Sequence, residues 1–315
     1  LVQVATYNDV TQETVREMKT YAEYLSRNGI RVQSGTGSIN LGFGDLDDDL
    51  DDEANAIGNI YTQGIGINAY SQGGRIDIHV DGKIVAGTEG IEVVNNGNGA
   101  TKIQTDGSID SGTTAININQ TGAGDLKVHA FGGKEKTPLD GDGYSYGVID
   151  GGDKGIYVSH DGAGTTESIT RSDIVGVSAG IELDHGSTSA TIKTYGKIDA
   201  DVDSGIGIYA ITSDDRVEEI TINTYDDVSA SKGIYVYSED DHDITIVADA
   251  NVYGRENAIR IINDSNRTDD SAPRTKISVT VKGDTTSETE SAIDVTSNYS
   301  NISTTLGSGS LVKSR

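Results

Sequence analysis

Aliphatic residues recur along the chain in one local pattern. Each occurrence has Gly or Ala, then Ile, then a variable residue, then a second aliphatic residue. Alternation of apolar and variable positions is typical of a β-strand with one buried face. The ten tetrads are Gly29-Ile30-Arg31-Val32, Gly64-Ile65-Gly66-Ile67, Gly90-Ile91-Glu92-Val93, Ala115-Ile116-Asn117-Ile118, Gly155-Ile156-Tyr157-Val158, Gly180-Ile181-Glu182-Leu183, Gly205-Ile206-Gly207-Ile208, Gly233-Ile234-Tyr235-Val236, Ala258-Ile259-Arg260-Ile261 and Ala292-Ile293-Asp294-Val295.

The distance between successive tetrads is nearly constant. The Ile residues are separated by 35, 26, 25, 40, 25, 25, 28, 25 and 34 residues, so five of the nine intervals are 25 or 26. The longer intervals are those expected when loops are inserted into a fixed period. Self-similarity at such a period predicts a repeat architecture in which each repeat packs on its neighbours.

Two more short apolar segments follow the tetrad in each period, as at 75–80 and 83–85. Three short strands separated by Gly, Asn and Asp turns predict one triangular coil, and parallel pairing stacks neighbouring coils about 4.8 Å apart. The sequence therefore predicts an all-β fold, a right-handed parallel β-helix (solenoid) of about ten coils over residues 29–315. Its length would be on the order of 50 Å.

Residues 1–28 have a different pattern and are predicted to form an N-terminal cap. Apolar residues from Val15 to Leu25 fall at helical spacing, Thr11 suits an N-cap, and Asn28-Gly29 would end the helix. A short amphipathic helix there would cover the open edge of the first coil, because open β-edges favour aggregation.

Three long intervals predict loops inserted into the rod, near residues 42–58, 132–150 and 263–275. An acidic run in the first is typical of a solvated loop. Tyr144 and Tyr146 in the second are candidate binding residues, because loops on a rigid scaffold commonly carry recognition.

Composition agrees with a thin core and excludes several functions. Only 34% of the residues are hydrophobic, with 2 Phe and no Trp, which is little for a globular core of this length. The net charge of −26 excludes nucleic acid as a partner and disfavours anionic membranes. The lack of cysteine excludes disulfides and thiolate metal sites.

Membrane insertion of this segment is not expected, because no apolar run reaches the roughly 18 residues that a spanning helix needs. The first residues have neither the basic region nor the apolar region of a signal peptide, so we expect any such peptide to have been removed.

Outward positions on the first strand of each coil predict a contact surface. Side chains alternate between the two faces of a strand, so the variable residue of a tetrad and the residue two places later are expected to point to solvent. Rows of exposed aromatic and aliphatic side chains on an acidic rod indicate a candidate contact surface. Cross-strand aromatic pairs that only stabilise the sheet give the same pattern, so both interpretations stay open. The residues that this reasoning places on one face are Tyr209, Tyr235, Tyr237, Arg260 and Ile262.

Two acidic arrangements are candidate Ca²⁺ sites, and no other cofactor is expected. Asp110 and Asp150 are predicted to stack one coil apart, where two carboxylates would split their pKa values or hold a cation. Asp199, Asp201 and Asp203 have the spacing that begins an EF-hand loop. The residues that such a loop needs at its sixth and twelfth positions are missing, so this second signal is weak.

Catalytic motifs are present only in fragments. Gly176–Gly180 matches G-x-S-x-G around Ser178, but a nucleophile elbow needs a helix afterwards and the next residues begin another tetrad. The tripeptides that begin at Asp110 and Asp203 match part of the Gly-Asp-Ser-Gly motif of serine-protease passengers, without its first glycine. We expect all three to be turns of the rod.

The histidines predict no zinc site. His79 and His129 are expected to face outward two coils apart, about 9.5 Å at the strand spacing. His160 and His185 occupy equivalent positions on adjacent coils, and a surface ladder is the expected arrangement.

These Gly-Ile-x-Val coils, with turns rich in Asn, Thr and Asp, resemble the passenger domains of classical (type Va) autotransporters, in particular the adhesin-like group. The resemblance covers residues 29–312. It implies export through a C-terminal outer-membrane β-barrel of the native chain, and a place on the bacterial surface or in the extracellular medium.

The function that this resemblance implies is that of a virulence factor and not an enzyme. Such a rod would bind a host cell-surface protein or an extracellular-matrix component, as an adhesin or a receptor ligand. One alternative is a polysaccharide-acting β-helix enzyme that uses outward Asp residues. Another is a self-associating autoaggregation factor, against which the charge of −26 argues unless Ca²⁺ bridges the rods.

Overall fold

A computed structural model describes residues 28–42, 56–131, 134–135, 145–212, 219–239, 242–264 and 275–314. Within these ranges the chain forms strands β1 to β30 and no helix, which confirms the all-β class. The predicted capping helix over residues 9–27 lies outside the described residues, as do Tyr144 and parts of the three predicted insertions.

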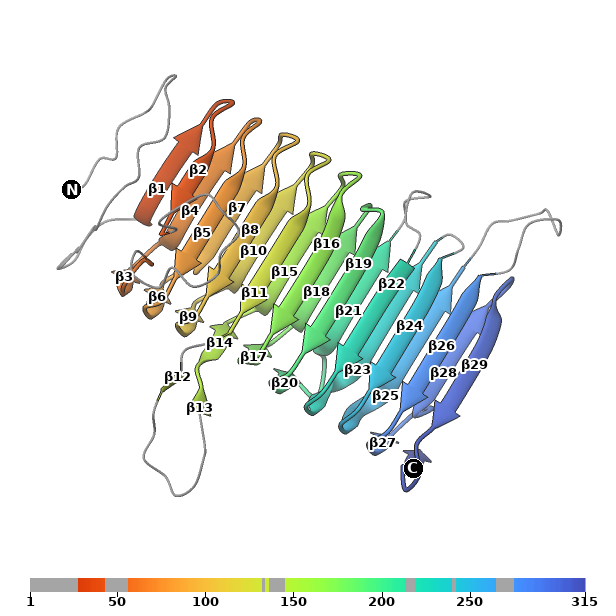
Figure 1. Ribbon diagram of the computed structural model, residues 1–315. Coiled ribbons are helices and arrows are strands. Elements are labelled where there is room, and N and C mark those ends of the chain that lie inside the picture. Colours follow the sequence, from red (N-terminus) through yellow and green to blue (C-terminus); the bar gives the residue numbers. More distant parts are fainter. Residues whose placement is uncertain are drawn as a thin grey trace.

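The strands form three parallel ladders that run along one rod, from β1 at the N-terminal end to β30 at the C-terminal end (Figure 1). The first ladder contains the tetrads. Its members are β1 (Asn28–Ser34), β4 (Ile65–Ser71), β7 (Ile91–Asn95), β10 (Thr114–Gln120), β15 (Lys154–His160), β18 (Ala179–His185), β21 (Ile206–Thr212), the later parts of β23 (Val228–Ser238) and β25 (Val252–Asn263), and β28 (Ile293–Ser297).

The second ladder is a separate 10-stranded sheet. It consists of β2 (Ile39–Leu41), β5 (Ile76–Val80), β8 (Thr101–Thr105), β11 (Leu126–Ala130), β16 (Thr165–Thr170), β19 (Ser189–Thr194), β22 (Glu219–Thr224), β24 (Asp243–Ala248), β26 (Lys276–Val281) and β29 (Asn301–Leu306).

The third ladder joins the first into one 18-stranded sheet, because β23 and β25 are long enough to belong to both. Besides the early parts of these two strands it contains β3 (Ile60–Thr62), β6 (Ile84–Ala86), β9 (Ile109–Ser111), β14 (Val148–Gly151), β17 (Asp173–Gly176), β20 (Ile198–Ala200), β27 (Thr285–Ser287) and β30 (Val312–Ser314). Three ladders of parallel strands in stacked sheets are consistent with a β-helix solenoid. A short antiparallel pair, β12 (Lys134–Glu135) and β13 (Ser145–Tyr146), projects from its side (Figure 1).

The core is a column of aliphatic side chains that stack on their equivalents in adjacent coils. Ile156, for example, pairs in register with Ile116 on one side and Ile181 on the other, and all three are at most 1% exposed. Burying an isoleucine contributes about 1.5–3 kcal/mol. A few such residues per coil therefore replace the large core that the composition lacks.

The register corrects two of the predicted tetrads by two residues. Ile67, rather than Ile65, pairs with Ile30 and Ile91 in the interior positions. Likewise Ile208, rather than Ile206, pairs with Ile181. Both segments read Gly-Ile-Gly-Ile, so either Ile fits the local pattern, and only pairing with the neighbouring strand selects the fully buried one.

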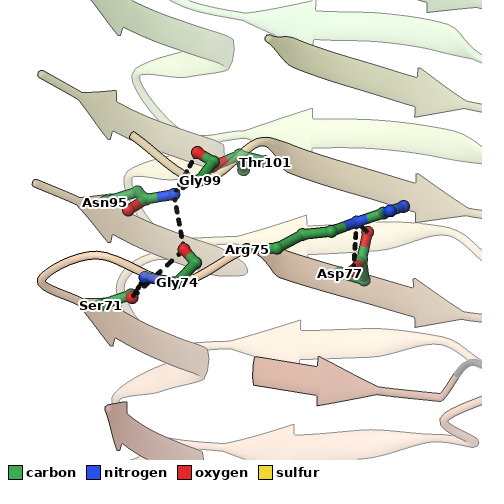
Figure 2. A network of polar contacts seen from close by, with 7 residues as sticks. All are labelled: Ser71, Gly74, Arg75, Asp77, Asn95, Gly99 and Thr101. Atoms are coloured by element: carbon green, nitrogen blue, oxygen red, sulfur yellow. Dashed lines mark hydrogen bonds and ion pairs between the residues drawn. The ribbon is translucent and has the colours of Figure 1, made fainter. Parts of the chain in front are cut away.

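From β4 to β25, the last residues of the first-ladder strands form a polar ladder inside the rod. Asn95 shows how such a residue is satisfied, since its side-chain nitrogen donates to the carbonyl oxygens of Gly74 (3.3 Å) and Gly99 (3.0 Å) and to the Thr101 hydroxyl (3.1 Å) (Figure 2). The Ser71 hydroxyl accepts the backbone N–H of Gly74 at 3.0 Å. These buried residues, none more than 1% exposed, are Ser71, Asn95, Gln120, His160, His185, Thr212, Ser238 and Asn263.

This ladder corrects the expected place of two histidines. His160 and His185 pair in register as predicted, but they are 0% and 1% exposed instead of lying on the surface. The reason is the two-residue period of a strand, which turns residue 160 inward together with Ile156 and Val158. His160 Nδ1 lies 2.7 Å from the Thr166 hydroxyl oxygen.

The other two predicted histidines are less exposed than expected. His79 lies on the outward row of β5 but is 2% exposed, and its Nε2 is 2.7 Å from an Asp106 carboxylate oxygen. His129, two strands along the ladder from it, is mostly buried beside Phe131 and lies 3.8 Å from Glu167.

Candidate binding face

Two outward rows of side chains cross three adjacent strands of the first ladder. In the first row, Tyr209 of β21 pairs in register with Tyr235 of β23, and Tyr235 pairs with Arg260 of β25. The second row lies two residues further along the same strands. The structure thus brings the five residues named from the sequence onto one face. We call the following set the tyrosine face: Tyr209, Ile211, Tyr235, Tyr237, Arg260 and Ile262.

Ile211 is the member that sequence reasoning missed. It pairs with Tyr237, which pairs with Ile262. The spacing in the sequence could have identified it. Ile211 follows the corrected tetrad isoleucine Ile208 by three residues, just as Tyr237 follows Ile234 by three residues. All six side chains are half-buried, so they remain accessible to a partner.

The first row is held together by ring stacking and nearby cations. The rings of Tyr209 and Tyr235 have centroids 5.2 Å apart and are inclined by 11°. Parallel pairing sets this distance, since strands are about 4.8 Å apart. Lys232 Nζ lies 5.5 Å from the Tyr235 ring centroid and the Arg260 guanidinium carbon 5.9 Å, within the range of cation–π attraction.

The cations around this face are already paired with carboxylates. Lys232 Nζ is 3.4 Å from Glu256. The Arg260 guanidinium is 3.9 Å from Glu290 and 3.8 Å from Asp294. They therefore supply little net positive charge to the surface.

Acidic residues of the preceding strand border the tyrosine face. Glu182 of β18 pairs in register with Tyr209, and Asp184 pairs with Ile211. Lys154 Nζ binds Glu182 at 2.9 Å and lies 4.4 Å from the Tyr157 ring centroid.

Burial and nearby acidic residues raise the pKa of three phenols on and beside the tyrosine face. For Tyr209, burial is the largest cause, followed by Tyr235 and Glu182. Burial also raises the pKa of Tyr157, reinforced by Asp184 and Glu182, and that of Tyr237, reinforced by acidic neighbours. The phenols are therefore neutral hydrogen-bond donors at any physiological pH.

Of the two tyrosines predicted in the second insertion, the structure describes the backbone of Tyr146. Tyr146 ends β13, where it pairs with Lys134, and the chain then enters β14 of the third ladder. Tyr144 lies outside the described residues.

Asp110 and Asp150 pair in register on β9 and β14, as the sequence predicted. Burial raises the pKa of Asp150, and the negative charge of Asp110 raises it further. The expectation of a turn is wrong for Asp110 and Ser111, because both belong to strand β9. The Ser111 hydroxyl donates to the Asp150 carbonyl oxygen at 3.3 Å, which gives this part of the protease-like motif a structural role.

Two of the three EF-hand-like residues, Asp201 and Asp203, have other partners. Asp201 accepts the backbone N–H groups of Asp203 (2.7 Å) and Ser204 (3.2 Å), which closes a turn. Asp203 pairs with Arg255, and Asp199 points outward from β20. Among the residues that the structure describes, no group of three or more His, Cys, Asp or Glu side chains is arranged to hold a metal ion.

Ser178 lies between two strands, β17 and β18, instead of between a strand and a helix. Its hydroxyl donates to the Asp153 carbonyl oxygen at 3.2 Å. The G-x-S-x-G match is therefore a turn between coils, as expected.

A second aromatic cluster, also missed, lies at the corner where the second strands end. The rings of Tyr195 and Tyr225 are stacked with centroids 4.5 Å apart, and both side chains are more than two-fifths exposed. On preceding coils, the Arg171 guanidinium lies 4.9 Å from the Phe131 ring centroid. The sequence could have identified this cluster, because each of these residues directly follows the second strand of its coil.

No helix long and apolar enough to cross a membrane occurs in the part of the chain that the structure describes. Comparison with protein-family models, with curated proteins and with solved structures finds no match.

Proposed function

We propose that this chain is the passenger domain of an autotransporter of the classical type, with a right-handed parallel β-helix of about ten coils and a capping helix at its N-terminal end. The 10-stranded second ladder and the register of the first ladder support this reading. In it, the rod is exported through a C-terminal outer-membrane barrel and is displayed on the bacterial surface or released.

The rod acts by binding and not by catalysis. The observation that carries this proposal is the tyrosine face, where three Tyr, two Ile and one Arg lie in two in-register rows on a chain of net charge −26. Exposed aromatic and arginine side chains are the residues that most often dominate protein–protein interfaces. The partner is a host cell-surface protein or a component of the extracellular matrix.

The test is binding of the purified rod to host cells and to immobilised matrix proteins. The variant changes Tyr209, Tyr235 and Tyr237 to Ser, and the control changes Tyr195 and Tyr225 to Ser, which removes a stacked pair elsewhere on the rod. We expect the triple variant to lose most binding and the control to keep it. Equal binding by the two variants would refute the tyrosine face as the site.

A second candidate function rests on the register pair of Asp110 and Asp150. Two neighbouring carboxylates, of which Asp150 has a raised pKa, suit acid–base chemistry on a polysaccharide. Incubation of the rod with acidic and neutral glycans, followed by assays for reducing ends and for unsaturated products, tests it. Products that disappear in Asp150→Asn would support this candidate over binding alone.

A further inference from the structure

Asp184 is an acidic residue of β18 on the negative border of the tyrosine face. Asp184 lies between Ser159 and Ile211 in the second outward row. Its neighbour Glu182 is paired with Lys154, whereas no ion pair to Asp184 occurs among the described residues. Burial raises the pKa of Asp184, and the charges of Asp161 and Glu182 raise it further.

Carboxylates also border the face where its strands end. Glu239 directly follows β23 and Asp264 directly follows β25. Both acidic residues raise the pKa of the Tyr237 phenol, after burial as the main cause. The Asp264 carboxylate accepts a hydrogen bond from the neutral Asn298 side chain at 3.3 Å, and no ion pair to it occurs among the described residues.

The face therefore combines apolar and aromatic side chains with an excess of negative charge along two borders. A cation that sat beside Asp184 would lie next to Ile211 and one strand from the Tyr209 ring. Such a position offers Coulomb attraction and contact with apolar surface for the aliphatic stem of Lys or Arg. Anionic glycans, nucleic acids and acidic lipid surfaces would be repelled by the same carboxylates.

We infer that the tyrosine face recognises a basic protein segment, in which Lys or Arg stands close to an aliphatic or aromatic side chain. The cation binds Asp184, and the neighbouring apolar side chain packs on Tyr209, Ile211 and Tyr235. This inference rests on the proposed function, and it adds the chemical class of the partner.

The test uses three short dye-labelled peptides and fluorescence anisotropy with the full chain. In the first peptide Lys and Leu alternate with Gly, in the second Glu replaces Lys, and in the third Gly replaces Leu. We expect the Lys–Leu peptide to bind the rod more tightly than either of the other two, and its binding to weaken as NaCl is raised.

Asp184→Asn is the decisive variant, and Asp199→Asn is its matched control, because Asp199 is an exposed acidic residue on the third ladder. We expect Asp184→Asn to weaken binding of the Lys–Leu peptide about fivefold, the upper end for one exposed ion pair. Asp199→Asn should change it by less than about twofold.

Equal affinity of the two variants would overturn the inference, as would equal affinity for the Lys–Leu and Lys–Gly peptides. The same variants are then assayed on host cells. If the triple tyrosine variant loses cell binding while Asp184→Asn keeps it, the proposed function stands and the basic partner is refuted. If neither changes cell binding, the tyrosine face itself is refuted.

Discussion

Tyr209 and Tyr235 stack across two adjacent coils, with ring centroids 5.2 Å apart and planes inclined by 11°. The stack joins β21 to β23 on the outside of the rod, as the isoleucine column joins them on the inside. The same two side chains thus stabilise the sheet and offer a surface to a partner, and these two roles can be measured separately.

We expect the stack to contribute to folding stability. In a double-mutant cycle with Tyr209→Ala and Tyr235→Ala, the coupling free energy should be about 0.5–1.5 kcal/mol, as for other aromatic pairs. Urea unfolding, fitted to a nearest-neighbour model for stacked repeats, measures it. A coupling free energy of zero would leave binding as the only role of the pair.

The isoleucine column should respond strongly to the loss of one side chain. Ile156→Ala removes a fully buried side chain between Ile116 and Ile181, so we expect a loss of about 2–5 kcal/mol. Ser159→Ala on the outward side of the same strand should change the free energy of unfolding by less than about 0.5 kcal/mol. Similar losses in both variants would contradict the assigned inward and outward faces.

The buried Asn95 side chain should be hard to replace. Asn95→Ala leaves the carbonyl groups of Gly74 and Gly99 without this donor, which costs about 1–3 kcal/mol for each group that stays unsatisfied. Asn95→Asp should be worse at neutral pH, because a carboxylate would face two carbonyl oxygens. Acidification should partly restore Asn95→Asp, and a variant that shows no such recovery in thermal unfolding would contradict this account.

His129 should make the rod less stable in mild acid. Burial lowers the pKa of His129, and Glu167 offsets only part of this effect. Because the unfolded chain takes up the proton at about pH 6.5 and the folded chain resists it, this contribution to stability is present above that pH. It is lost as the pH falls through about 6.5 toward the lower folded-state pKa. The free energy of unfolding of His129→Gln should therefore fall less between pH 7.5 and 5.5 than that of the unchanged chain.

Asp150 should make the rod less stable at neutral pH than in acid, the opposite of His129. Burial and Asp110 raise the pKa of Asp150, so its ionised form destabilises the fold, and this penalty disappears as the pH falls through the raised folded-state pKa. Asp150→Asn should stabilise the rod at pH 7 by up to about 0.5 kcal/mol, a size typical of exposed charges. The gain should vanish near pH 3, and denaturant unfolding at the two pH values measures it.

The sequence by itself determined the coil, because alternation of Ile and Val with polar residues encodes which side of each strand is buried. It also placed Tyr209, Tyr235 and Tyr237 on one face and stacked Asp110 with Asp150, since equivalent positions in a repeat lie over one another. The two-residue alternation within strands and the spacing of the repeat were sufficient for these predictions.

Only the tertiary structure decided the questions that depend on contacts between coils. Pairing with neighbouring strands chose Ile67 over Ile65, and it turned His160 and His185 into the buried polar ladder. It also let the third strand of one coil run into the first strand of the next in β23, without the expected turn. The physical reason is that the alternation within a strand determines which residues share a face. The register depends on the partner strand, which lies 24 to 40 residues away in the sequence.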